Sequence, residues 1–178
     1  MRPSLGSRPK VVFLVGFMGA GKTSVGRALG RLLNWKFEDL DDRIEAREGR
    51  SIERIFADSG EAGFRRAESA ALSELLRERD WFPRVVALGG GAFVQAQNAA
   101  MIQAAGVPTV FLDAPVEELY RRCEQEQRER PLRRDVKQFR ELYEQRQQSY
   151  LAAGLRVDTY GKEVDAVAAE VACSLGLG

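Results

Sequence analysis

The sequence predicts an α/β fold in which a parallel sheet is covered by helices on both faces. Short apolar runs typical of strands alternate along the chain with longer stretches of helical periodicity. The clearest runs, VVFLV at 11–15 and VVAL at 85–88, are apolar throughout, as strands buried on both faces require. Parallel strands need long crossovers that are usually helices, so this alternation favours a parallel sheet.

Each element follows from a local pattern. A strand at 11–15 ends at a glycine, and a helix at 22–33 places Val25, Ala28, Leu29 and Leu32 on one face. In chain order we then expect a weak strand at 35–37, a helix at about 42–48 and a helical turn at 51–56 capped by Ser51. A long helix at 61–79 is expected to turn Phe64, Leu72, Leu75 and Leu76 inward, and it is followed by a strand at 85–88, a helix at 97–105 and a strand at 109–112. The last expected elements are helices at about 116–127 and 136–151, a strand at 155–159 and a helix at 164–175.

Composition indicates an ordinary globular chain. Its 178 residues suit one domain with a sizeable core, so we expect residues 1–178 to form a single domain, with 1–9 as a flexible extension. The formal net charge is +1, which argues against general attraction to nucleic acid or to a membrane. The apolar run at 11–20 is too short to span a bilayer.

The chain has no histidine, which excludes a histidine base and histidine metal ligands. Its two cysteines, Cys123 and Cys173, are fifty residues apart and belong to no paired motif. We therefore expect neither a disulfide nor a zinc site, and we expect a protein of the reducing cytoplasm.

A phosphate-binding loop follows the first strand. The segment GFMGAGKTS at 16–24 satisfies the P-loop pattern through Gly16, Gly21, Lys22 and Thr23, with a strand before it and a helix after it. Its backbone amides and the helix N-terminus bind phosphate, Lys22 reaches the β- and γ-phosphates, and the Thr23 hydroxyl ligates Mg²⁺. The base-reading motif of GTPases is missing, and the chain is short for a motor ATPase.

Four carboxylates gather in WKFEDLDD at 35–42, just past the second strand. If extended geometry continues, Asp39 and Asp41 point to the same side and face the cleft beside the P-loop. Phosphoryl transfer uses one carboxylate near the metal and one at the acceptor hydroxyl, so we assign Asp39 to Mg²⁺ and Asp41 to the acceptor. Glu38 and Asp42 are expected to be surface and helix-start acids. The alternative is that the whole cluster only opens a helix.

The order of motifs from about residue 11 to 162 resembles the shikimate kinase family. The resemblance is carried by GFMGAGKTSVGR, FEDLDD, GRSIERIF, GEAGFRRAE, ALGGGA, RPL and YEQRQQSY, and most specifically by F-R-x-x-E at 64–68 followed by GGG. It implies a three-layer α/β/α P-loop kinase with a five-stranded parallel sheet and a mobile lid at about 124–137. It also implies that ATP and Mg²⁺ are used to phosphorylate the 3-hydroxyl of shikimate, giving shikimate 3-phosphate and ADP on the path to chorismate and aromatic amino acids.

The resemblance assigns an acceptor site. Arg65 and Arg146 match the arginines that bind the shikimate carboxylate, in keeping with the bidentate geometry of guanidinium. Glu68 lies three residues after Arg65, where it can brace that side chain. Gly90 and Gly91 match glycines that lie against shikimate, whereas the alternative is a flexible turn.

The resemblance also assigns a nucleotide site. Arg130 precedes Pro-Leu where the family has a lid arginine over the ATP phosphates, and it joins Lys22 and Asp41 as a catalytic residue. Lys162 stands in the adenine-side loop where an arginine is common, and the RRD stretch after RPL also departs from the pattern. The remaining lid charges are expected to be solvated. The residues implied to contact ATP are Gly19, Ala20, Gly21, Lys22, Thr23, Ser24, Arg130 and Lys162.

Other functions remain open from the sequence. A gluconate-type kinase would share the P-loop but should lack the combination of Asp41, Arg65 and Arg146, and a nucleotide kinase would need a base-reading acceptor pocket. A ligand-sensing relative would carry a helix-turn-helix segment before the P-loop, and only fifteen residues precede Gly16 in this chain. We expect a catalytic monomer whose partners are shikimate and ATP.

Overall fold

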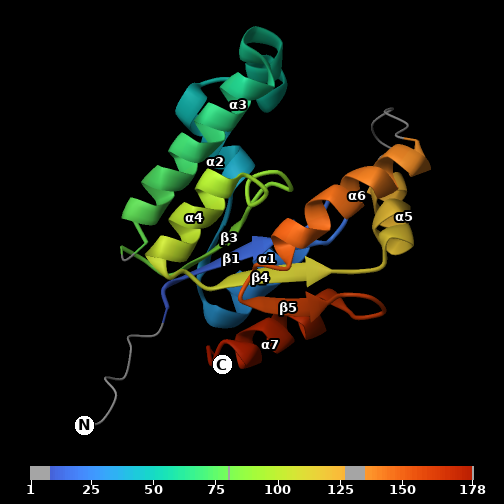
Figure 1. Cartoon of the computed structure of the whole chain (residues 1–178). Coiled ribbons are helices and arrows are strands. Elements are labelled where there is room, and N and C mark those ends of the chain that lie inside the picture. Colours follow the sequence, from blue (N-terminus) through green and yellow to red (C-terminus); the bar gives the residue numbers. More distant parts are fainter. Residues whose placement is uncertain (1–8, 80, 127–134, 178) are drawn as a thin grey trace.

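The fold, seen in a computed structural model, is built on a parallel sheet with strand order β2-β3-β1-β4-β5 (Figure 1). The structure describes residues 9–79, 81–126 and 135–177. Every neighbouring pair in the sheet is parallel, which confirms the predicted class. The strands are β1 (Val11–Val15), β2 (Lys36–Asp39), β3 (Arg84–Ala87), β4 (Thr109–Asp113) and β5 (Leu155–Asp158).

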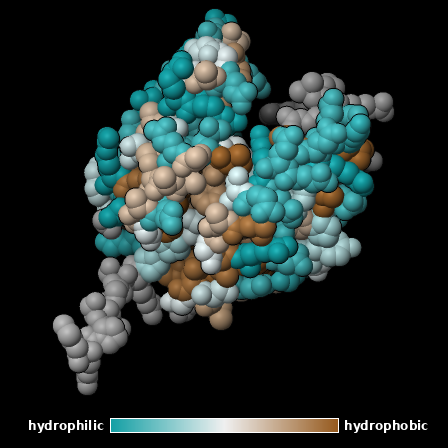
Figure 2. Space-filling view, viewed as in Figure 1, coloured by the Kyte–Doolittle hydropathy of each residue, from teal (hydrophilic) through white to brown (hydrophobic). Residues whose placement is uncertain are grey.

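Helices cover both faces of this sheet and make three layers. α1 and α7 pack together on one face, while α3, α4 and α6 lie on the other (Figure 1). The outer surfaces of α3 and α6 are largely hydrophilic, and hydrophobic residues reach the surface between them (Figure 2). The helices are α1 (Lys22–Leu33), α2 (Leu40–Glu48), α3 (Ile52–Arg77), α4 (Ala96–Ala105), α5 (Val116–Glu126), α6 (Val136–Tyr150) and α7 (Val164–Ser174).

β1 is the centre of the sheet and of the core. All five of its residues are buried, and it pairs with β3 on one side and β4 on the other. The predicted inward residues of the long helix, Phe64, Leu72, Leu75 and Leu76, are also buried. Ligands of open parallel sheets bind beyond the carboxyl ends of the central strands, so the segments after β1 and β3 occupy the functional edge.

Two predicted elements differ in a way that matters for the site. α2 begins at Leu40 rather than near residue 42, because the Asp39 carboxylate accepts the Asp41 backbone N–H and caps the helix. The expected turn at 51–56 and helix at 61–79 form one element, α3, which is kinked at Gly60 (φ 64°, ψ −172°).

One predicted core residue is exposed. Leu32 keeps 57% of its surface accessible, although the helical pattern placed it on the inner face. The buried face of α1 follows Gly26, Leu29 and Gly30, where the chain lies close to Phe37 of β2. This rotation turns Leu33 toward the core instead.

Several predictions fall on residues that the structure does not describe. The expected lid at about 124–137 includes 127–134, with Arg130, and the expected N-terminal extension at 1–9 includes 1–8. Across the described ranges, no helix has both the length and the apolar character needed to cross a membrane. Cys123 lies buried in α5, and Cys173 lies exposed in α7.

Candidate active site

The P-loop connects β1 to α1 at the centre of the sheet. The Lys22 ammonium donates hydrogen bonds to the carbonyl oxygens of Gly16 (2.8 Å) and Phe17 (3.0 Å), so the loop curls around its own lysine. Gly19 has φ +79°, and a Cβ there would lie 2.5 Å from the Leu119 carbonyl oxygen of α5. The loop therefore needs glycine both for its backbone conformation and for its close packing against α5.

A cavity of about 620 Å³ opens beside the P-loop. Five of the predicted nucleotide-binding residues line it, together with parts of α5, α7 and the loop after β5: Gly19, Ala20, Gly21, Ser24 and Lys162. The Lys162 ammonium bonds to the Glu170 carboxylate of α7 (2.6 Å), so its charge is engaged outside the P-loop. The cavity joins residues that are more than 130 positions apart in the sequence, as the prediction required.

Arg122 also lines this cavity, although the sequence analysis assigned it no role. Its guanidinium donates to the Thr159 hydroxyl (3.0 Å), to the Thr159 carbonyl (3.2 Å) and to the Gly19 carbonyl (3.4 Å). Its side chain is only 22% exposed, and Glu118 one turn earlier accepts from it as well. The available signal was its place on α5 between the buried residues Leu119 and Cys123.

Asp39 lies at the end of β2 within reach of the P-loop. The Thr23 hydroxyl donates to its Oδ2 at 3.4 Å, while its Oδ1 caps α2. Burial raises the pKa of Asp39 above its usual range. Asp39 therefore starts a helix and also faces the phosphate loop, while its assignment to Mg²⁺ stays a prediction.

Asp41 reaches the cleft by a route that the sequence reading did not foresee. It sits in the first turn of α2 instead of continuing the strand, so the premise of shared strand geometry was wrong. Its side chain nevertheless faces the cleft, with Oδ1 3.2 Å from the position a Cβ would take on Gly89. Burial, and then the Asp39 charge, raise the pKa of Asp41 to about 6.

Glu38 is not the surface acid that we expected. Its carboxylate accepts from Arg43 (2.9 Å) and from the fully buried Arg84 (3.3 Å). Strand alternation turns it away from Asp39 and into a charged network with Glu78. Asp42 is exposed in the first turn of α2, as predicted.

The triple glycine after β3 is the meeting point of the predicted acceptor residues. A Cβ on Gly91 would lie 2.8 Å from the Arg65 guanidinium carbon, and one on Gly90 would lie 3.5 Å from Arg146 Nη1. Arg65 comes from α3 and Arg146 from α6, so two arginines approach one turn from opposite sides. Any side chain on the turn would occupy the space between them.

Each arginine is held by a neighbour. Arg65 Nη1 donates to Glu68 Oε2 at 3.0 Å, and Glu68 is 1% exposed, which confirms the predicted brace. The Arg146 guanidinium carbon lies 5.9 Å from the ring centre of Phe17, a P-loop residue. Arg66 is exposed, as predicted, and the cleft keeps a pair of partly buried positive charges.

Burial shifts the titration of the central lysine. It lowers the pKa of Lys22 to about 8, while the Asp39 and Asp41 charges act in the opposite direction. One lysine, two carboxylates and two arginines therefore share the carboxyl edge of the sheet. In the described part of the chain, no three His, Cys, Asp or Glu residues form a metal-binding group.

A central parallel strand that ends in a P-loop, with an acidic pair and an arginine pair facing it, defines a P-loop kinase of small molecules. A family model described as shikimate kinase matches residues 18–175 of the chain. The chain belongs to the shikimate kinase family.

Individual relatives agree with this assignment. A shikimate kinase from Geobacter metallireducens is 43% identical over 90% of this chain and 88% of its own length. The solved shikimate kinase from Acinetobacter baumannii in complex with shikimate has a TM-score of 0.83 at 34% identity, covering 96% of this chain and 94% of that one. A gluconokinase from Sinorhizobium meliloti shares the fold at a TM-score of 0.59 and 15% identity, covering 95% and 93% of the two chains.

Proposed function

We propose that this chain transfers the γ-phosphoryl group of ATP to the 3-hydroxyl of shikimate, giving shikimate 3-phosphate and ADP. The observation that carries the proposal is the convergence of Asp41, Arg65 and Arg146 on the triple-glycine turn beside the P-loop. The family assignment supports shikimate as the acceptor, because these residues match the motifs by which the sequence resembles that family. The proposal places the protein in the path to chorismate, and we expect it to act in the cytoplasm as a monomer, without nucleic acid or membrane partners.

ATP is expected to bind along the P-loop with its base in the 620 Å³ cavity. Phosphate oxygens would replace the loop carbonyls as partners of the Lys22 ammonium, and the backbone around Gly19 to Ser24 would cradle them. Arg122 already contacts the P-loop and the loop after β5, so it fits the rim of the base pocket. Arg130 lies outside the described residues and keeps its proposed role over the phosphates.

The Thr23 hydroxyl and the Asp39 carboxylate suit a hard cation. They lie 3.4 Å apart and supply oxygen, the donor that Mg²⁺ prefers, with phosphate oxygens and water left to complete the shell. Bound there, Mg²⁺ would neutralise charge that develops on the phosphates.

The acceptor is expected to lie on the triple-glycine turn. Arg65 and Arg146 offer two guanidinium groups to one carboxylate, and the missing side chains at Gly90 and Gly91 let the ring approach the backbone. That arrangement leaves an acceptor hydroxyl near Asp41, which accepts its proton as the oxygen attacks the γ-phosphorus. A carboxylate with a pKa of about 6 is ionised at neutral pH and still basic enough to assist that transfer.

The decisive experiment measures ADP release in a coupled assay with shikimate, gluconate and nucleoside monophosphates side by side. The proposal expects turnover with shikimate alone, and loss of that turnover in a folded Lys22→Ala variant. Preference for gluconate would instead support the other small-acid kinase reading. Tight shikimate binding without turnover by the wild-type protein would support a ligand-sensing domain.

The separate roles of the two acids can be tested by titrating Mg²⁺ at saturating shikimate. Asp39→Asn is expected to raise the Mg²⁺ concentration needed for half-maximal activity by about 10–100-fold. Asp41→Asn is expected to lower kcat by about 10²–10⁴ with little change in the Mg²⁺ requirement. Identical Mg²⁺ profiles for the two variants would show that the roles are misassigned.

A further inference from the structure

The triple-glycine turn is supported by a buried amide that the sequence reading passed over. Asn98, in the first turn of α4, is fully buried. Its amide nitrogen donates to the Ala92 carbonyl oxygen at 3.0 Å, and Ala92 directly follows the turn. Its amide oxygen accepts from the Ser69 hydroxyl of α3 at 2.7 Å. A buried amide with both ends engaged has one defined orientation, because reversing it would oppose like groups.

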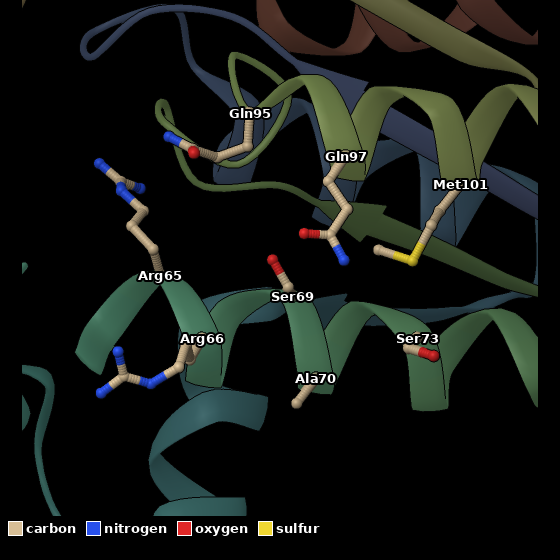
Figure 3. A pocket seen from close by; sticks show the side chains of 8 residues that line it. All are labelled: Arg65, Arg66, Ser69, Ala70, Ser73, Gln95, Gln97 and Met101. Carbon is tan, nitrogen blue, oxygen red and sulfur yellow. The ribbon is translucent and has the colours of Figure 1, made fainter. Parts of the chain in front are cut away.

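These two hydrogen bonds, together with the close packing of the Arg65 guanidinium against Gly91, form a ring around one side of the acceptor site. Ser69 lies four residues after Arg65, so the two side chains project from the same face of α3. Figure 3 shows both directed from α3 toward α4 and the loop before it. The ring runs from Arg65 along α3 to Ser69, through Asn98 to Ala92, and back through Gly91 to the Arg65 guanidinium.

The other side of the turn is anchored differently. The Tyr150 hydroxyl of α6 donates to the Gly90 carbonyl oxygen, and the Ala92 backbone N–H donates to the Gly89 carbonyl (3.0 Å). Tyr150 thus ties the turn to the helix that carries Arg146, whereas Asn98 ties it to the helix that carries Arg65. Gly91 lies so close to Arg65 that no methyl group would fit between them, and Asn98 holds the residue that follows Gly91.

We propose that Asn98, oriented by Ser69, is a positioning residue for the acceptor: it fixes the triple-glycine turn against Arg65 and thereby sets the fit of the acceptor carboxylate. The inference rests on the proposed function, since it concerns the same acceptor site. It involves no contact between Asn98 and substrate. It predicts a defect confined to acceptor binding, because the P-loop and the nucleotide cavity have no share in the ring.

The main test compares Asn98→Leu, which has similar volume but no hydrogen-bonding groups, with Ser69→Ala, which removes only the hydroxyl that orients the amide. Asn98→Leu is expected to raise the KM for shikimate roughly tenfold, because small displacements of positioned groups are costly, while the KM for ATP stays within about twofold. Ser69→Ala should change the KM for shikimate in the same direction by about threefold. Gln97→Ala is the matched control, since Gln97 is the exposed neighbour on α4 in the groove of Figure 3 and should leave both KM values unchanged.

A second readout does not depend on the substrate. Hydrogen exchange measured by mass spectrometry should be faster in Asn98→Leu for a peptide spanning 88–93 and unchanged for one spanning 16–24. If Asn98 has only a structural role, Asn98→Leu should lower the melting temperature and kcat while both KM values stay unchanged, and that result would overturn the proposal. An unchanged KM for shikimate in a folded Ser69→Ala variant would also overturn the proposal. Failure of the wild-type protein to phosphorylate shikimate would instead contradict the proposed function. Faster exchange at 88–93 in Asn98→Leu would in that case still show that Asn98 holds the triple-glycine turn.

Discussion

Lys22 and Asp41 lie in the same buried cleft, and burial shifts their titration in opposite directions. It lowers the pKa of the lysine to about 8 and raises the pKa of the aspartate to about 6, because each charged form loses hydration. Both groups remain mostly charged at neutral pH, but the pKa of each lies closer to neutral pH than it would in water. Residues poised in this way are typical of sites that bind or move charge.

The first prediction concerns the pH dependence of nucleotide binding. Protonated Lys22 binds phosphate, and the bound phosphates raise its pKa again, so the complex takes up a proton. The contribution of Lys22 to ATP affinity should therefore be complete well below pH 8 and should be lost as pH rises from about 8 toward 10. Calorimetry at pH 8.5 in two buffers of different ionisation enthalpy should reveal proton uptake on ATP binding.

Lys22→Met provides the control for this effect. The variant should bind ATP weakly at every pH and show no proton uptake linked to binding. If uptake at pH 8.5 persists in the variant, another group is responsible and the assignment of the lowered pKa to Lys22 is wrong.

The second prediction concerns the stability cost of Asp41. Its pKa in the folded protein lies above the value of about 3.8 for the unfolded chain, so folding favours the protonated form. The free energy of unfolding therefore declines as pH rises through about 6, where the buried carboxylate ionises. Asp41→Asn removes that charge and should raise the melting temperature at pH 7.5 while changing it little at pH 4, where Asp41 is protonated.

Activity and stability should move in opposite directions in this variant. Asp41→Asn is expected to be more stable at pH 7.5 than the wild-type protein and much slower in turnover. A variant that is less stable at pH 7.5 would show that the ionised side chain contributes favourable interactions larger than its burial cost.

Single elements were predictable where their determinants are local. Periodicity located α1, α5, α6 and α7, and apolar runs located β1, β3 and β4, each to within about two residues. Errors arose where one side chain decided between alternatives. The Asp39 cap started α2 early, and the flexibility of Gly60 let α3 continue through a kink where the sequence indicated two helices.

The third prediction tests that kink. Gly60 has a backbone conformation that is essentially reserved for glycine, and a Cβ there would meet no atom within 4 Å. Gly60→Ala should therefore lower the free energy of unfolding through backbone strain alone, by about 2 kcal/mol. Urea denaturation would measure the change.

Gly49, which ends α2 with φ 66° and ψ 21°, is the matched position because it has the same open surroundings. Its left-handed helical conformation costs an alanine about 1 kcal/mol, so Gly49→Ala should be the milder change. Equal stability of the two variants would indicate that α3 straightens without cost and that the kink is not enforced by the chain.

At the scale of the whole molecule, the sequence predicted which residues matter better than it predicted their partners. The P-loop lysine, both acids and the glycine turn meet at one edge of the sheet, because they follow strands whose carboxyl ends coincide. The two arginines reach the same edge from α3 and α6. Arg122 was missed because its partner Thr159 is distant in sequence. Glu38 was misread because its partner Arg84 lies on the neighbouring strand, and strand order cannot be derived from local pattern.

That hidden pairing leads to the fourth prediction, which concerns the stability of the fold as a whole. Fully buried Arg84 donates to the carboxylates of Glu38 and Glu78 (3.3 Å each) and to the Glu78 carbonyl (2.7 Å), linking β2, β3 and the end of α3. Arg84→Met fills similar space but leaves the two partly buried carboxylates with Arg43 as their remaining shared cation. Breaking one side of a buried ionic network costs about 3 kcal/mol, which in a chain of this size lowers the melting temperature by about 6–12 °C.

Arg47→Met is the comparison variant, since Arg47 also pairs with two glutamates but is 36% exposed, and surface pairs contribute less than about 1 kcal/mol. Arg84 begins β3, whereas the acceptor turn follows the end of that strand, so Arg84→Met should leave the KM values for ATP and shikimate unchanged when measured below the melting range. A loss of stability no greater than that of Arg47→Met would show that the buried network is neutral. An increased KM for shikimate would show instead that the two ends of β3 are coupled and that the network helps to shape the cleft.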